Sequence, residues 1–120
     1  MVVQDAKLLQ GVDVTKGLKP GGWILLNSPG PPERLDAFSG FRLAFVDATQ
    51  IAVDCDLGTR THPIINTAMI GAFARMMDMP PLDIISEAIQ TEITTKPEKN
   101  IRASKEAYEQ VSLNSKVALI

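Results

Sequence analysis

The chain has 120 residues, the length of one domain with a single core, which excludes a multidomain enzyme. Apolar residues make up 45% and charged residues 22%, so disorder and collagen-like architectures are excluded as well. The 12 basic and 14 acidic side chains give a net charge of −2 with no basic stripe, and nucleic acid is therefore not an expected partner.

The sequence predicts neither a membrane span nor a secretory leader. Its longest apolar runs, such as residues 23–26, are far shorter than the roughly 18 residues that a span needs, and no basic segment followed by an apolar one opens the chain. Cys55 is the single cysteine, which excludes an internal disulfide and any iron–sulfur or all-cysteine zinc site held by this chain alone. An unpaired thiol fits a reducing compartment, and we expect a cytoplasmic protein.

Three short apolar runs predict strands at residues 2–4, 23–27 and 43–46. Continuous apolar strands of this kind are typical of a parallel sheet that is covered on both faces. About twenty residues separate one run from the next, which leaves room for a short crossover each time. The expected fold is therefore α/β, a Rossmann-like open parallel sheet with flanking helices in one domain, residues 1–120.

Helices are predicted after the third strand, at roughly 48–53, 63–78, 82–93 and 98–110. Gly58 is the candidate cap that follows the first of them. The final helix mixes apolar and polar positions and should lie half exposed.

The helix at 63–78 is apolar nearly all the way round, which predicts that it is buried rather than on the surface. Pro63 suits its first turn, and its small residues, Gly71 among them, allow close approach to a sheet or to another helix. A methionine series in and just after this helix is interpreted as core: Met69, Met76, Met77 and Met79.

Polar residues end the predicted strands, and ligands of open α/β sheets bind beyond the carboxyl ends of strands. Asp5, Asn27 with Ser28, and Asp47 occupy these positions. Their alternative role is to start turns and to cap the following helix. Asn66 and Thr67, near the start of the buried helix, could donate hydrogen bonds to an anion or could satisfy neighbouring backbone groups.

Nucleophilic and acid–base chemistry has little support in the sequence. His62 is the single histidine, and no neighbour offers an orienting partner for a general base, so we interpret it as a polar residue at a helix entry. Cys55 lies between two aspartates, which disfavour a thiolate, and is interpreted as a packed, inert thiol. We predict no catalytic residue and no metal site.

Four stretches carry a family resemblance through their order and spacing: residues 17–27, 46–49, Asn-Thr-Ala-Met-Ile-Gly-Ala-Phe-Ala at 66–74, and Glu-Lys-Asn-Ile-Arg-Ala at 98–103. Together they resemble the gamma subunit, or gamma domain, of the 2-oxoacid:ferredoxin oxidoreductases of the pyruvate synthase group. The last two stretches carry most of the resemblance, which runs from about residue 2 to residue 111.

The resemblance implies an enzyme subunit, within a complex that converts a 2-oxoacid and coenzyme A to acyl-CoA and CO2 while reducing ferredoxin. Such a complex uses thiamine diphosphate, Mg, iron–sulfur clusters and coenzyme A, which in the family belong mainly to other subunits. The gamma domain borders the active site, and this makes Asn27, Ser28, Asn66 and Thr67 the candidate cofactor-binding residues. The expected partners are the other subunits and, through them, ferredoxin.

The chain departs from the family in one respect, because the N-terminal glycine-rich turn of family gamma domains is absent. It therefore resembles the C-terminal part of a gamma domain, as a fragment, a chain whose true start lies upstream, or a split subunit. An unpaired sheet edge is expected beside residues 2–4, and association with other subunits or with a second copy follows from it. A free-standing α/β small-molecule-binding domain and a pure interaction domain are the alternatives.

Overall fold

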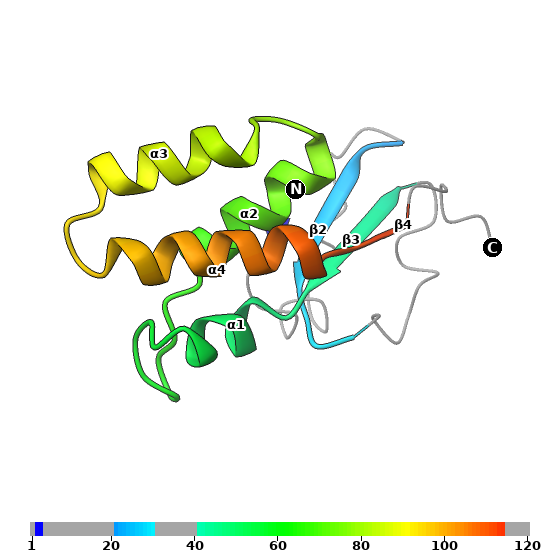
Figure 1. Cartoon of the computed structure of the whole chain (residues 1–120). Helices are drawn as coiled ribbons and strands as arrows, with labels where there is room; N and C mark the ends of the chain where they lie inside the picture. Colours follow the sequence, from blue (N-terminus) through cyan, green and yellow to red (C-terminus); the bar gives the residue numbers. More distant parts are fainter. Residues whose placement is uncertain (1, 4–20, 31–40, 115–120) are drawn as a thin grey trace.

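The computed structural model describes residues 2–3, 21–30 and 41–114 of the chain (Figure 1). Strands and helices follow one another as β1 (Val2–Val3), β2 (Trp23–Asn27), β3 (Arg42–Val46), α1 (Ala48–Asp54), α2 (Asn66–Met77), α3 (Leu82–Glu92), α4 (Pro97–Gln110) and β4 (Ser112–Asn114). All four helices lie between β3 and β4 in the sequence, so the described helical part is one continuous segment.

The described sheet has the order β1-β2-β3-β4. The first three strands are parallel, which confirms the predicted α/β class, and β4 runs antiparallel to β3. β2 has the predicted bounds, β3 begins one residue earlier than predicted, and residue 4 of the first predicted strand lies outside the described residues. The antiparallel β4 was not predicted, and the sheet is therefore mixed rather than purely parallel. β1 forms one edge of it.

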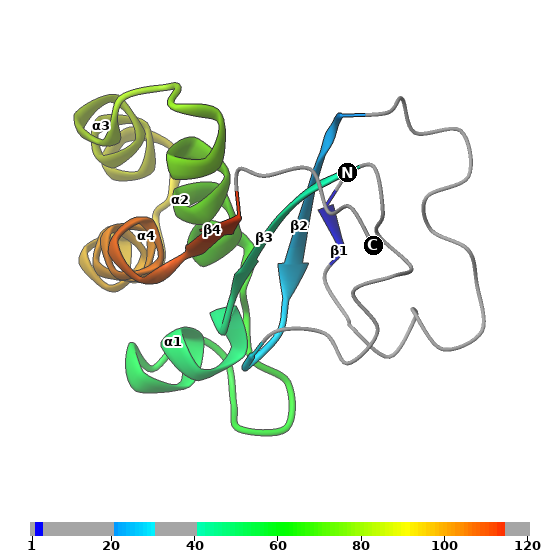
Figure 2. The same cartoon turned by 90° about the vertical axis from the view of Figure 1, so that its right-hand side faces the viewer.

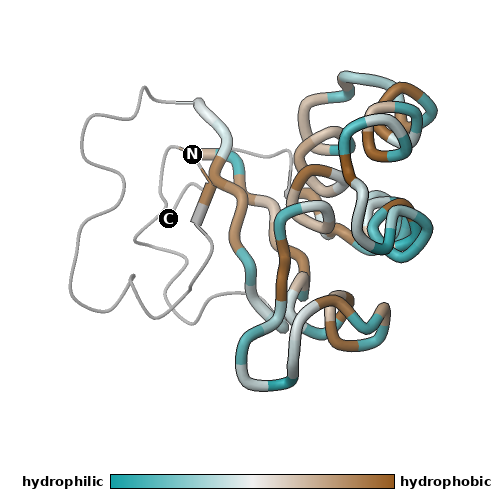
Figure 3. The backbone as a smooth tube through the Cα atoms, turned by 90° about the vertical axis from the view of Figure 1, so that its left-hand side faces the viewer, coloured by the Kyte–Doolittle hydropathy of each residue, from teal (hydrophilic) through white to brown (hydrophobic). Residues whose placement is uncertain are grey.

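The helices lie on one side of the sheet, as Figure 2 shows. Leu25 and Ala44 face them and join side chains of α1, α2 and α4 in the main core. The alternate residues Ile24 and Leu26 belong to a second cluster on the opposite face. All four side chains are fully buried, which confirms that both faces of the central strands are covered. In Figure 3 hydrophobic stretches follow these strands, while hydrophobic and hydrophilic segments alternate on the helices.

Three helices have nearly the predicted bounds, and α2 does not. α2 begins at Asn66 rather than at Pro63, because Pro63 forms a β-bridge with Gly58 and the Ile64 amide donates to the Leu57 carbonyl at 3.1 Å. An extended segment therefore occupies the place where the sequence favoured a first-turn proline.

α1 also ends differently from the prediction. Cys55 is its C-cap, and Asp56 takes the left-handed conformation with φ 57°. Gly58 has a positive φ as well, but it serves the bridge that follows the helix rather than the helix end.

α2 is buried on the sides that meet the sheet and α4, and exposed on a third side. Ile70, Phe73 and Met77 remain 47%, 39% and 43% exposed, so the prediction of a helix buried all round is wrong for this chain. The methionine prediction holds in part, because Met69 and Met76 lie in the core whereas Met77 and Met79 are exposed.

α2 and α4 cross at Gly71, which confirms the predicted role of a small residue in close packing. A Cβ built at Gly71 would fall on the carbonyl oxygen of Ser104 in α4 and lie 2.7 Å from the carbonyl carbon. Ser104 is itself fully buried, and α4 buries one face and exposes the other, as predicted. Backbone therefore meets backbone at this crossing, and a larger residue has no room there.

α3 forms an outer layer on α2 and α4. Ile85 and Ile89 are its two buried residues, and they pack with Ala74 of α2 and with Ile101 and Tyr108 of α4. α3 is thus held mainly by one apolar stripe of two isoleucines.

Candidate functional site

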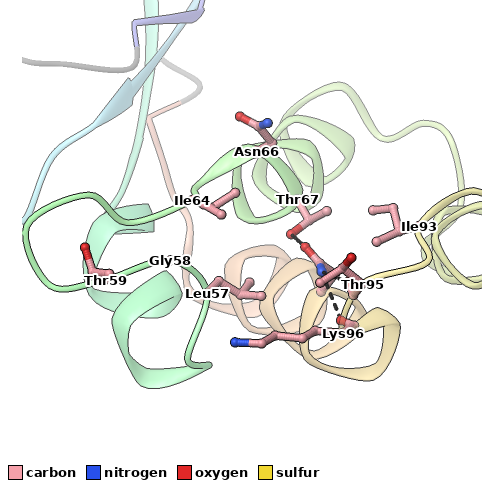
Figure 4. A pocket seen from close by; sticks show the side chains of 10 residues that line it. Leu57, Gly58, Thr59, Ile64, Asn66, Thr67, Ile93, Thr95 and Lys96 are labelled. Atoms are coloured by element: carbon pink, nitrogen blue, oxygen red, sulfur yellow. Dashed lines mark hydrogen bonds between the residues drawn. The ribbon is translucent and has the colours of Figure 1, made fainter.

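A cavity of about 500 Å³ lies where the loop after α1, the start of α2 and the α3–α4 connection meet (Figure 4). Its lining is apolar in part and otherwise consists of threonine, asparagine and lysine side chains: Leu57, Gly58, Thr59, Ile64, Asn66, Thr67, Ile93, Thr95, Lys96 and Asn100. The lining contains no cysteine, histidine or carboxylate, and its threonine, asparagine and lysine side chains offer hydrogen bonds beside the apolar contacts.

Gly58 shapes the wall of the cavity on the side of the loop. A Cβ at this position would fall on the His62 carbonyl oxygen and lie 2.9 Å from the Ile64 amide nitrogen, and the φ of Gly58 is +76°. The loop closes further through the Thr59 amide, which donates to the His62 carbonyl at 3.2 Å. Only glycine fits this approach of backbone to backbone.

A buried hydrogen-bond chain forms the floor between α2 and α4. Thr67 donates its hydroxyl to the Asn100 side-chain oxygen at 2.9 Å, and both side chains are buried. The Asn100 amide donates in turn to the Thr95 and Lys96 carbonyls at 3.3 and 2.9 Å. The chain thus ties the first turn of α2 to the residues that open α4.

Positive charge at the rim is paired with Asp56. Lys99 and Lys96 approach an Asp56 carboxylate oxygen at 2.7 and 3.4 Å, and Lys96 also donates to the Asp56 carbonyl at 2.9 Å. The hydrogen bonds from Lys99 and Lys96 lower the pKa of Asp56 below its ordinary value. The lysines are therefore partly neutralised before any ligand arrives.

Two helices begin at the cavity without a side-chain cap. Ile65 is the N-cap of α2 and Lys96 that of α4, and neither N-cap side chain accepts a hydrogen bond from the first turn of its helix. Asn66 is exposed at the α2 start, and Figure 4 shows it at the edge of the cavity. The first-turn amides of both helices favour hydrogen-bond acceptors on this side of the molecule.

The four predicted cofactor-binding residues separate into two pairs. Asn66 and Thr67 line the cavity, and Thr67 is held by Asn100. Asn27 accepts from the Ala48 amide at 2.9 Å and donates to the Thr49 hydroxyl at 3.0 Å, so it anchors the start of α1. Asn27 thus has the alternative role that the sequence analysis gave to polar residues at strand ends, namely capping of the following helix.

Ser28 and Asp47 also have local structural partners. The Ser28 hydroxyl donates to the Gly30 carbonyl at 2.6 Å and closes a turn after β2. The Asp47 side chain accepts from the Gln50 amide at 3.0 Å as the N-cap of α1. Neither residue lines the cavity, and Asp5 lies outside the described residues.

Cys55 occupies the environment that the sequence predicts, whereas His62 lies in the loop four residues before α2 and not at the helix entry. His62 is exposed, and its ring lies 3.1 Å from the Thr61 hydroxyl. Cys55 is 3% exposed, and its thiol lies 3.8 Å from a Glu106 carboxylate oxygen. Burial, followed by the Glu106 charge, raises the pKa of Cys55 above its ordinary value. A packed thiol is thus confirmed.

The sequence analysis selected two of the ten lining residues, Asn66 and Thr67, and missed the other eight, which include Gly58, Lys96 and Asn100. A signal for Asn100 was present, since it stands in the stretch at 98–103 that carries the family resemblance, as Thr67 stands in the stretch at 66–74. The hydrogen bond between Thr67 and Asn100 joins these two stretches.

Iron–sulfur clusters and metal ions find no suitable ligand set in the described part of the chain. No group of three or more His, Cys, Asp and Glu side chains there could hold a metal ion. Cys55 is the one cysteine of the sequence, and its buried thiol faces a carboxylate, which opposes the thiolate that a cluster requires.

The described helices include none long and apolar enough to span a membrane.

Comparison with known proteins identifies named relatives. The chain is 38% identical over 112 residues to "Pyruvate synthase subunit PorC" of Methanocaldococcus jannaschii, covering 92% of this chain and 58% of that protein. It is 40% identical over 117 residues to "Pyruvate/ketoisovalerate oxidoreductases common subunit gamma" of Pyrococcus furiosus, covering 94% of this chain and 61% of that protein. The chain thus spans about 60% of the length of these relatives.

A solved structure has the same fold. The crystal structure of the pyruvate oxidoreductase subunit PORC of Thermotoga maritima superposes with a TM-score of 0.76 at 31% sequence identity, over 93% of this chain and 62% of that one. Residues 1–110 match the family described as "Pyruvate ferredoxin/flavodoxin oxidoreductase". The chain therefore belongs to the pyruvate ferredoxin/flavodoxin oxidoreductase family, and the relatives described above are PorC, or gamma, subunits of that family.

Proposed function

We propose that the chain is a gamma-type subunit, or the C-terminal part of one, in a complex that oxidises a 2-oxoacid. In this reaction the 2-oxoacid and coenzyme A give acyl-CoA and CO2, and the electrons released reduce ferredoxin. The observation that carries the proposal is the similarity to two named gamma-type subunits, at 38% and 40% identity over more than nine tenths of this chain.

The chemistry of the described residues supports a non-catalytic part in that reaction. The cavity lining holds no carboxylate, histidine or thiol, and the single cysteine is buried against Glu106. Thiamine diphosphate, Mg and the iron–sulfur clusters therefore belong, in this proposal, to other subunits of the complex. Ferredoxin meets the assembled enzyme, and the cytoplasm is the proposed compartment.

The cavity beside α2 is the part of the chain that we propose to border the active site. Asn66 stands exposed at its edge, and Thr67 and Asn100 hold the floor. Uncapped helix starts at Ile65 and Lys96 add backbone donors around it. A phosphate or carbonyl group of coenzyme A matches these donors better than an apolar group does.

Reconstitution tests the function. The chain is co-expressed with the other subunits of a pyruvate oxidoreductase complex, and reduction of ferredoxin is followed with pyruvate and coenzyme A. We expect turnover in the complete complex and none with the purified chain alone. Turnover by the chain alone, or full activity of the complex without it, would contradict the proposal.

A substitution tests the cavity within the complete complex. Asn66→Ala should raise the KM for coenzyme A by about ten- to a hundredfold and leave kcat nearly unchanged, because one hydrogen bond to a charged group contributes about 1.5–3 kcal/mol. Gln90→Ala is the control, since Gln90 is an exposed amide on α3 and does not line the cavity. An unchanged KM in Asn66→Ala would show that Asn66 does not bind coenzyme A. The assignment of the chain as a gamma-type subunit would not be affected.

A further inference from the structure

An apolar surface lies between α2 and α3, on the far side of α2 from the sheet. Three α2 residues and one α3 residue form it, and we call it the α2–α3 face: Ile70, Phe73, Met77 and Ile84. A second cavity, of about 350 Å³, opens between the two helices and includes Ile70 and Ile84 in its lining. Phe73 and Met77 do not line this hollow but continue the apolar side of α2 beyond Ile70. Exposed hydrophobic side chains beside a hollow are typical of a protein interaction site.

The arrangement of the α2–α3 face suits a helix. Ile70, Phe73 and Met77 follow the i, i+3, i+7 spacing that places side chains along one side of α2. Ile84 supplies the opposite wall of the hollow, and Ala88 beside it adds no bulk. A groove of this kind accepts the apolar stripe of an amphipathic helix, and methionine adapts readily to the shape of the side chains that enter.

The segment that runs from the end of α2 through α3 carries charge of one sign. Residues 76–95 contain four acidic residues and no lysine, arginine or histidine, namely Asp78, Asp83, Glu87 and Glu92. Glu92 itself lines the hollow. The nearest basic residue on α2, Arg75, lies over the Tyr108 ring of α4 at 5.5 Å and is engaged there. The segment thus carries a formal charge of −4 while the whole chain carries −2.

We propose that the α2–α3 face docks an apolar helix flanked by lysine or arginine residues, contributed by another subunit of the oxidoreductase complex. The apolar side chains supply the contact, and the acidic segment selects a basic partner and guides its approach. This inference rests on the proposed function, since it takes the partner from the same complex.

A second copy of the chain fits the face less well than a basic partner does. Two copies that met through their α2–α3 faces would bring two segments of formal charge −4 together. Like charges placed opposite one another weaken association, most strongly at low salt. The charge pattern therefore favours a heteromeric contact over self-association.

Binding measurements test the proposal with the full chain and the purified remaining subunits of the complex. Phe73→Ser and Ile84→Ser remove apolar contact from side chains that are 39% and 50% exposed, so folding should survive. Each should weaken binding about tenfold or more, as expected for side chains at the centre of an interface. Leu113→Ser is the control, because Leu113 is 40% exposed on β4, and its binding should match that of the wild type.

A charge reversal tests the partner's chemistry. Glu92→Lys should slow association severalfold at low salt, and the difference from the wild type should shrink as salt is added. Glu109→Lys on α4 is the matched control and should not change the association rate, since Glu109 is exposed away from the hollow.

The possible results distinguish the proposed function of the chain from the proposed role of the α2–α3 face. Failure of the wild-type chain to bind the other subunits would overturn the proposed function. If Phe73→Ser and Ile84→Ser bind the other subunits as the wild type does, the proposed docking role of the α2–α3 face is refuted. The proposed function is not affected by that result. A homodimer of the wild type that these two variants dissociate would show that a second copy occupies the face, and would also overturn the proposal.

Discussion

Replacing Gly71 by alanine should destabilise the chain, although alanine favours helices. The added Cβ would fall on the Ser104 carbonyl oxygen and lie 2.7 Å from the carbonyl carbon, whereas ordinary contact begins at 3.4 Å, so α2 and α4 must separate by at least about 0.7 Å. A gap of that size forfeits a quarter to a half of each dispersion contact across the crossing. The neighbours there, Ala72 and Ala103, are fully buried and lose contacts with it.

The net magnitude follows from two opposed effects. Overpacking against backbone that cannot rotate away costs about 3 kcal/mol, and the gain in helix propensity from glycine to alanine returns about 1 kcal/mol. The expected loss in free energy of unfolding is about 2 kcal/mol, which lowers Tm by about 8 °C in a chain of this size.

Urea unfolding, followed by circular dichroism and by the single tryptophan, measures this loss at one fixed protein concentration, because association would shift the midpoint. Gly30→Ala is the control, since a Cβ at Gly30 meets nothing within 4 Å and its φ is not positive. It should unfold within about 0.5 kcal/mol of the wild type. A Gly71→Ala midpoint equal to that of the wild type would refute the close crossing of α2 and α4.

Two further predictions concern buried polar groups. Thr67→Val should cost about 1–3 kcal/mol of unfolding free energy, because the buried Asn100 oxygen loses its donor, and urea titration should show no such loss for Thr91→Val, whose hydroxyl is exposed. Glu106→Gln should lower the raised pKa of Cys55, because it removes the negative charge that opposes the thiolate. The pH profile of iodoacetamide labelling should then shift toward lower pH than in the wild type, and an unshifted profile would show that the Glu106 charge does not raise the pKa of Cys55.

The sequence predicts those strands and helices whose local residue pattern alone indicates whether they are buried. The apolar run at 23–27 can hardly be anything but a buried strand, and the structure gives β2 the same bounds. α2 was placed too early because Pro63 satisfies the local rule for a first helical turn, while its actual partner, Gly58, is a β-bridge contact. β4 escaped prediction because three residues carry almost no periodicity, and its pairing with β3 spans most of the chain.

The residues of the candidate cavity also divide into those that local sequence rules can select and those that long-range contacts bring in. Asn66 and Thr67 could be proposed from their place near a helix start, as local rules allow. Asn100 and Lys96 could not, because they reach the cavity through contacts with Thr67 and Asp56 that lie 33 and 40 residues away in the sequence. Sequence reasoning had already selected the stretches that contain Thr67 and Asn100, without any means of showing that they touch.

The way in which α3 is held has a consequence for motion. Only Ile85 and Ile89 of this helix are buried, whereas α1 is fastened to the end of β2 by the Asn27 side chain. Amide protons in α3 should therefore exchange with solvent through a local opening that leaves the sheet, α1 and the α2–α4 crossing intact. Because Ile84 moves with α3, the width of the hollow beside α2 can adjust to an incoming helix at small cost to the rest of the fold.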